Sequence, residues 1–455
     1  MARAIMGDGV TKITQDNLEE ALQQAIEIEI ATIPVYLSTY YSINRTPDQK
    51  ELIKGFTKRL IDKGETKQNA ATKALALSAK IMVFANRAGA NIMSVVVEEM
   101  LHMSLSSNVK QSLFGNPELV GKSPSIWPAY LAGHEPEFPI NRAKLSIEQL
   151  ETFKKIESPV PIDANLRFTS AIPYFTIGDF YQGIEDCIRD HFCCKDNYHP
   201  DRPQLVPNRG YYAQNNIDTI YYDKQHKPVY ENAADAGGLI HVVDQASALK
   251  ALKTVVDQGE GKNVTDPFDD DSCHELSHYY KFALLQEELK DIKRQFQKEF
   301  GCEFDVENHF IHDFADNAET QDYPVTIQAV STLTNAMYAY LFIMSQACYH
   351  AEEHTQFEIF MFGIHKSMLW ILSSLCGEMT GLKYLGSDGQ QYTATATFEE
   401  YQFSSASSPK SQIIELFNQA VGVNDGIAYL GQRIHDLPNV SIEGFLERSN
   451  TPLMA

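Results

Sequence analysis

The chain is poor in cysteine and lacks the patterns that give cysteine a structural role. It has seven cysteines in 455 residues, and none of them forms a Cys-x-x-Cys pair. A disulfide framework needs an even set, and structural zinc sites need paired ligands at short spacing. The sequence therefore argues against a disulfide scaffold or a structural zinc module. The adjacent Cys193 and Cys194 are interpreted as ordinary reduced thiols.

Long hydrophobic runs and an excess of basic residues are also missing. No uninterrupted stretch of 18 apolar residues occurs, so no transmembrane helix is predicted. The N-terminus lacks the continuous apolar segment of a signal peptide. Acidic residues outnumber basic ones by 60 to 38, which gives a net charge of −22. Such a charge repels nucleic acid and anionic membranes, so we expect a cytoplasmic protein that binds neither.

Apolar residues at helical spacing are present over most of the chain. They predict one helix over 14–42 and a second from about 70 or 79 to 113, where Gly-Asn-Pro stops it. Further predicted helices cover 146–155, 174–192, 244–258, 269–300, 325–349, 355–380 and 409–432. No internal repeat interrupts this pattern. The predicted fold class is therefore mainly α.

Two Glu-x-x-His pairs are the most informative motifs, and each lies in a predicted helix. They are Glu99–His102 and Glu275–His278. Residues at positions i and i+3 share one face of a helix. Each pair is thus predicted to direct a carboxylate and an imidazole toward the same point.

Two single glutamates extend this pattern. Glu29 falls on the apolar stripe of its helix, and burying an unpaired carboxylate there is costly. In helix 174–192 we choose Glu185 as the inward-facing acid and keep Asp179 as the reserve. The order Glu, Glu-x-x-His, Glu, Glu-x-x-His along four helices is typical of ferritin-like bundles that hold two Fe or Mn ions. The predicted ligands are Glu29, Glu99, His102, Glu185, Glu275 and His278.

Other interpretations of these residues exist. His274 and Glu275 form the motif His-Glu-Leu-Ser-His with His278, which matches a zinc hydrolase motif but leaves Glu99 and His102 without a role. A second metal site near His350, His354 and His365 competes with the simpler interpretation of a solvated helix junction. Three tyrosines near the predicted ligands are interpreted as core aromatics rather than donors to them: Tyr36, Tyr40 and Tyr181.

Several segments also resemble a known family. The chain is similar, over about 15–300, to the ferritin-like domain of iminophenyl-pyruvate dimer synthase type, which occurs in the large enzymes of violacein and rebeccamycin biosynthesis. The resemblance supports Glu99/His102 and Glu275/His278 as ligands. Those enzymes are far longer and carry a haem region, and Asp179 stands where the family has Glu. The matching segments are AIEIEIATIPVYL (25–37), VVVEEMLHMSLSSN (95–108), LSIEQLETFKKIESP (145–159), TIGDFYQGIE (176–185), ALKTVVDQGEG (251–261) and ELSHYYKF (275–282).

The predicted organisation is a ferritin-like four-helix bundle over 14–300, with insertions at 117–161 and 195–265. A helical extension over 301–455 packs on it, and its apolar helices are consistent with a homodimer. The leading hypothesis is an O₂-using di-iron oxidase or oxygenase acting on a small molecule, in which Glu99 and Glu275 bridge the metals. The resemblance implies an amino-acid-derived substrate in specialised metabolism. The alternatives are an imine-coupling enzyme and a non-enzymatic metal-binding protein.

Overall fold

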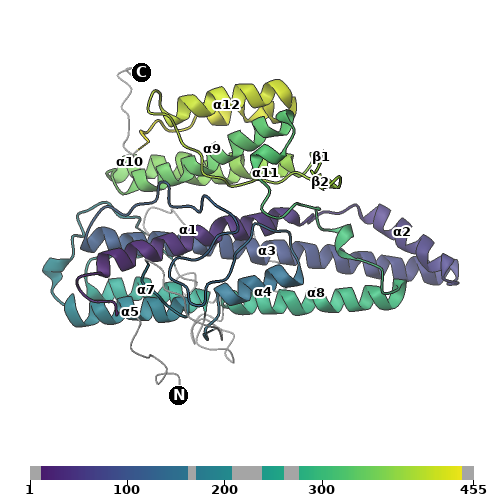
Figure 1. Cartoon of the computed structure of the whole chain (residues 1–455), viewed down its shortest axis with the longest axis horizontal. Helices are drawn as coiled ribbons and strands as arrows, with labels where there is room; N and C mark the ends of the chain where they lie inside the picture. Colours follow the sequence, from purple (N-terminus) through teal and green to yellow (C-terminus); the bar gives the residue numbers. More distant parts are fainter. Residues whose placement is uncertain (1–11, 162–170, 207–237, 261–275, 443–455) are drawn as a thin grey trace.

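The protein is a stack of helical layers. The computed structural model describes residues 12–161, 171–206, 238–260 and 276–442. In Figure 1 the long helices α1 (Leu18–Ser42) and α3 (Lys67–Leu113) form the middle layer. Shorter helices cover one side of this pair, and the C-terminal helices cover the other. The prediction of a mainly α bundle is confirmed.

α1 and α3 are continuous, and α1 runs through an internal proline, Pro34. α3 has 47 residues, about 70 Å at 1.5 Å per residue. It begins after Thr66, whose hydroxyl accepts from the Asn69 amide, and ends before Gly115, which has a φ of +85°. α2 (Gln49–Asp62) packs along its first part. α1 starts at 18 rather than at the predicted 14, because the Asn17 side chain binds the Thr14 amide in a turn before the helix.

The other two positions of the bundle are occupied by interrupted helices. α4 (Ile147–Ile156) packs on α8 (His278–Phe300), and α5 (Ile177–His191) packs on α7 (Gln245–Gly259). Figure 1 shows these two pairs at opposite ends of the same layer. Two interruptions, one between α4 and α5 and the other between α7 and α8, therefore lie near the middle of the bundle. α4 belongs to the bundle, although it lies in the predicted insertion 117–161. The other domain boundaries stay a prediction.

The last bundle helix begins later than predicted. The expected helix over 269–300 starts at His278, because Ser277 has an extended backbone with φ −60° and ψ 159°. Glu275 lies outside the described residues, as does His274. Leu276 and Ser277 are not helical, so α8 does not extend back beyond His278. The positions of Glu275 and His274 relative to His278 stay predictions, both for the bundle and for the zinc hydrolase motif.

The C-terminal layer is built on α9 (Val325–Cys348), which packs on α12 (Pro409–Val423). A second rod begins with α10 (Glu353–Glu358) and ends with α11 (Ser373–Met379). Between them the backbone is π-helical, over Ile359–His365 and Ser367–Leu372. The remaining elements are the 3₁₀ turns Lys195–Asn197, Glu307–His309, Thr320–Asp322 and Asp425–Leu430, α13 (Gly431–His435), and the antiparallel strands β1 (Lys383–Leu385) and β2 (Gln391–Thr393).

Two helices are long and apolar enough to be candidate membrane spans, which the sequence analysis did not predict. They are α3 and the rod His354–Met379, whose most apolar windows are 72% and 50% buried inside the protein. A central helix of a bundle passes the same test because it is buried on all sides. For α3, burial in the bundle accounts for its apolar character.

Candidate metal centre

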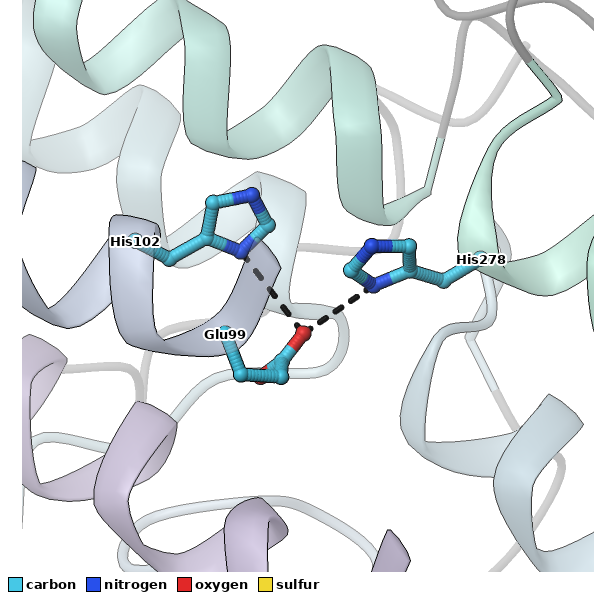
Figure 2. Close-up of side chains that lie close together, drawn as sticks. All are labelled: Glu99, His102 and His278. Atoms are coloured by element: carbon cyan, nitrogen blue, oxygen red, sulfur yellow. Dashed lines mark ion pairs between the residues drawn. The ribbon is translucent and has the colours of Figure 1, made fainter. Parts of the chain in front are cut away.

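A buried cluster of imidazoles and carboxylates lies beside the two interruptions. Its centre is the Glu99 carboxylate on α3 (Figure 2). Glu99 Oε1 lies 3.0 Å from His278 Nδ1 and 3.6 Å from His102 Nδ1. The two imidazole rings stand 5.4 Å apart at an interplanar angle of 24°. All three side chains are at most 3% exposed, and their ligand atoms lie within 4.8 Å of one another.

Two more carboxylates flank this centre, one beside each histidine. Glu29 on α1 places Oε2 3.6 Å from His102 Nδ1. Glu157, directly after α4, places Oε2 3.7 Å from His278 Nδ1. The arrangement consists of two half-sites, Glu29 with His102 and Glu157 with His278, with Glu99 between them.

Hydrogen bonds orient both imidazoles in the same way. Nε2 of His102 lies 3.0 Å from the Gln258 side-chain oxygen, and Nε2 of His278 lies 2.7 Å from Glu98 Oε2. Lys281 also donates to this oxygen of Glu98. Because both acceptors hold the proton on Nε2, each Nδ1 is directed at the carboxylates. Histidines that bind metals usually donate their other ring N–H in this manner.

Each carboxylate is oriented in a complementary way. One oxygen accepts a hydrogen bond from a hydroxyl group, and the other oxygen faces an imidazole. The hydroxyl bonds are Thr32 Oγ1 to Glu99 Oε2 at 2.7 Å, Tyr181 to Glu29 Oε1 at 2.6 Å and Tyr36 to Glu157 Oε1 at 2.5 Å. The interpretation of Tyr36 and Tyr181 as core aromatics alone is therefore incomplete.

Burial and mutual repulsion make this cluster proton-rich in the metal-free state. Burial raises the pKa of Glu29 to about 7, against the hydrogen bond from Tyr181. Burial and the nearby Glu29 charge also raise the pKa of Glu99. Burial opposes a charge on His278, but the surrounding acids Glu157, Glu98 and Glu99 raise its pKa well above the usual value. Burial lowers the pKa of His102. A bound cation would replace these protons.

A further buried acid, Glu260, connects the end of α7 to the start of α5. Glu260 directly follows α7, and its Oε1 accepts the Gly178 amide at 2.6 Å near the start of α5. A Cβ atom at position 178 would lie 2.2 Å from Glu260 Oε2, so any larger residue there would displace the Glu260 carboxylate. Burial raises the Glu260 pKa well above its usual value. Glu260 thus joins α7 to the N-terminus of α5.

The structure brings together four of the six predicted ligands: Glu29, Glu99, His102 and His278. Glu185 is not among them; it pairs with Arg189 at 3.4 Å. The structure instead brings Glu157 to the cluster, beside His278. The reserve, Asp179, has no contact with the cluster among the described residues. Glu275 lies outside the described residues, so its role stays a prediction.

The sequence contained a signal for two of the residues that were missed. Glu157 continues the spacing of Leu150 and Phe153, which are both buried on α4. Gln258 continues the buried positions Leu252 and Val255 on α7 in the same way. The rule that identified Glu29 applies to both. No such pattern indicates Glu98, which is next to Glu99 in sequence.

The proposed second metal site is not supported. His354 lies 3.8 Å from Glu358, and the two side chains are 88% and 60% exposed. Within the described ranges, a group of three or more ligands close enough to share an ion occurs only at Glu99, His102 and His278. The solvated helix junction is the better interpretation of this region.

The donor set of the buried cluster fits a metal centre. It offers carboxylate oxygens and imidazole nitrogens without sulfur, which suits Fe, Mn or Zn. His278 Nδ1 is buried and forms no hydrogen bond, although Glu99 Oε1 is only 3.0 Å away. Donor atoms that converge without bonding to each other are the arrangement expected around a cation.

A comparison with known protein families identifies the family of the fold. A family model described as ferritin-like matches residues 22–287. A solved structure of a ferritin-like protein from Caulobacter vibrioides is 15% identical, with a TM-score of 0.44, over 78% of this chain and 98% of that chain. At that score the structural similarity carries no argument of its own. A search of curated proteins found no match.

Proposed function

The chain belongs to the ferritin-like family, and on that premise we propose that it is a metal-dependent oxidoreductase with a di-iron centre that acts on a small molecule. The observation that carries the proposal is the pair of half-sites around Glu99. Glu29 and His102 would hold one ion, Glu157 and His278 the other, and Glu99 would lie between both. Manganese would suit the same ligands.

The protein's contribution to such chemistry is orientation and the exclusion of water. When bound, two iron ions supply a route for electrons between a substrate and O₂. The surrounding hydroxyl groups fix the carboxylate oxygens, and Gln258 and Glu98 fix the imidazoles. Because these groups are buried, little solvent competes for the site. The phenols of Tyr36 and Tyr181 have pKa values well above 10, raised by burial, so they remain proton donors to the acids.

Two other functions are compatible with a metal centre. The resemblance to iminophenyl-pyruvate dimer synthases favours coupling of an amino-acid-derived imine, with the metal as template or Lewis acid. A non-enzymatic metal-binding protein is the third candidate. We place the activity in the cytoplasm, on a substrate from specialised metabolism. We also propose that the protein forms a homodimer.

The first experiment is the metal content per chain. Protein purified without chelators and reconstituted with Fe(II) under anaerobic conditions is expected to hold about two ions, counted by elemental analysis. Glu99→Ala is expected to lose both, since Glu99 lies between the half-sites. The matched control is Glu185→Ala, an acid of the same bundle that pairs with Arg189 instead.

Retention of both ions in Glu99→Ala would exclude this cluster as the centre. Once the metal is established, O₂ uptake separates the three functions. Uptake that depends on an added substrate supports the oxidoreductase, turnover without O₂ supports imine coupling, and iron uptake without turnover supports a binding protein.

A further inference from the structure

A second cavity lies on the opposite side of the α1–α3 pair, between the bundle and the C-terminal layer. Its volume is about 650 Å³, within the range of small-molecule sites. The walls come from α1, α3, α9 and the π-helical rod. Glu99 and Met100 are neighbours in α3, so they face directions about 100° apart. Glu99 faces the metal cluster, and Met100 lines the cavity.

The wall is mostly apolar, although polar side chains such as Asn44, Asn86 and His312 also line it. Four methionines line it, three from α3 and one from the rod: Met93, Met100, Met103 and Met368. Methionine side chains are flexible and polarizable, and they accommodate ligands of irregular shape. Such a wall suits an apolar body rather than a sugar or a nucleotide.

The charge of the cavity is opposite to that of the protein as a whole. The chain has a net charge of −22, yet no aspartate or glutamate is among the described lining residues. Arg45 is the one permanently charged side chain in that lining. It forms no ion pair with any acid in the described part of the chain, and its guanidinium lies 5.0 Å from the Tyr40 ring centroid. An arginine in this setting is suited to bind a carboxylate.

The position of Arg45 is fixed by the fold. A Cβ atom at Gly89 would lie 2.3 Å from Arg45 Cδ, so the stem of the arginine occupies space that a glycine on α3 leaves open. The stem packs on α3 while the guanidinium stacks on a ring of α1. An oriented guanidinium loses less freedom when it binds an anion.

The π-helical rod provides the remaining wall. Ser367–Leu372 contributes Met368, Leu369 and Leu372 to the lining. π-helical turns are rare, and they occur frequently at functional sites. Thirteen π-helical residues occur in the two stretches of this rod, seven and six long. The second of these stretches therefore forms part of the cavity wall.

From these observations we propose that the cavity binds an amphipathic carboxylic acid, with its apolar body among the methionines and its carboxylate on Arg45. The lining of the cavity includes none of the cluster's ligands, and binding there does not depend on the proposed oxidoreductase activity. Both an alkyl chain and an aryl group would supply the apolar body of such an acid. Decanoate is the probe for an alkyl body, and 4-phenylbutanoate is the probe for an aryl body.

Isothermal titration calorimetry of the metal-loaded full chain tests the site. At least one of the two acids is expected to bind, with one molecule per chain. If decanoate binds, decan-1-ol, which lacks the charge, should bind at least tenfold more weakly. Arg45→Gln should lower the affinity for the acid at least tenfold. The matched control is Arg59→Gln, since Arg59 also stacks on a ring, at 5.3 Å from Phe304, but lies outside the cavity.

A second pair of variants tests the location without removing a charge. Gly377 lines the cavity on α11, and a Cβ atom there would meet no other atom within 4 Å. Gly377→Leu should fill the space and reduce binding at least tenfold. Gly422→Leu on α12 has equal room and should have no effect. Failure of both acids to bind, or binding unchanged in Arg45→Gln and Gly377→Leu, would overturn the proposal.

Discussion

The two sides of the α1–α3 pair follow different rules. On the bundle side, hydroxyl groups, Gln258 and Glu98 orient the buried acids and imidazoles around Glu99 through hydrogen bonds. On the other side, the same helices present methionines and aliphatic residues to a cavity in whose described lining Arg45 is the one permanently charged side chain. The polar side has a defined geometry because directional hydrogen bonds orient each ligand. The apolar side depends on how well its side chains fill the available volume, because apolar contacts impose little directional preference.

This difference predicts how the two sides respond to change. Loss of one polar group should leave its partner buried without compensation, whereas an apolar exchange of similar volume should be tolerated. The effects should also stay on their own side, because distant sites without shared partners behave independently.

The largest expected effect is on the half-site that the sequence did not predict. Glu157→Ala should lose about one of the two ions, because Glu157 is the carboxylate beside His278. Elemental analysis checks this, with Glu185→Ala as the control that retains both. Decanoate or 4-phenylbutanoate binding should change less than twofold. Loss of ligand binding in Glu157→Ala would show that the two sides are coupled.

The second effect is the pH dependence of stability in the metal-free protein. The Glu29 pKa rises from about 4.5 to about 7 on folding, so the folded state holds a proton that the unfolded state releases. The resulting stability is fully present below pH 4.5 and is lost as the pH rises through 7. At 1.36 kcal/mol per pKa unit the change is about 3 kcal/mol.

Thermal unfolding of chelator-treated protein at pH 5 and pH 8 measures this change. The unfolding midpoint should be lower at pH 8. Glu29→Gln should remove much of the difference, since glutamine does not titrate. An equal pH dependence in wild type and Glu29→Gln would mean that Glu29 is not the titrating group.

A smaller effect is expected from the groups that only orient the ligands. Tyr181→Phe removes the donor to Glu29, and Gln258→Leu removes the acceptor for His102. Each should weaken metal affinity by about 10- to 100-fold without abolishing binding. Competition with a chelator of known affinity gives the value. Tyr340→Phe is the control, because that buried hydroxyl bonds Pro438 far from the cluster.

The smallest effect should come from the cavity wall. Met100→Leu conserves volume and should cost less than about 1.5 kcal/mol of unfolding free energy. The metal content should stay at the wild-type value, although Met100 is the neighbour of Glu99 in sequence. Loss of metal in this variant would show that the cavity wall also supports the ligands.

The sequence by itself determined the continuous helices and the ligands within them. Helical spacing, the Gly-Asn-Pro stop after α3 and the buried position of Glu29 are local properties, and local patterns predict them. Glu99 and His102 are a true i, i+3 pair because α3 runs through the site without interruption.

Only the tertiary structure decided which residues complete the site. The other two bundle helices are interrupted, so Glu157 and His278 reach Glu99 from the end of α4 and the start of α8. The spacing of a continuous helix led to Glu185 and to a helical Glu275–His278 pair. Helical periodicity fixes which residues share a face within one helix, but contacts between the ends of separate helices depend on how the layers pack.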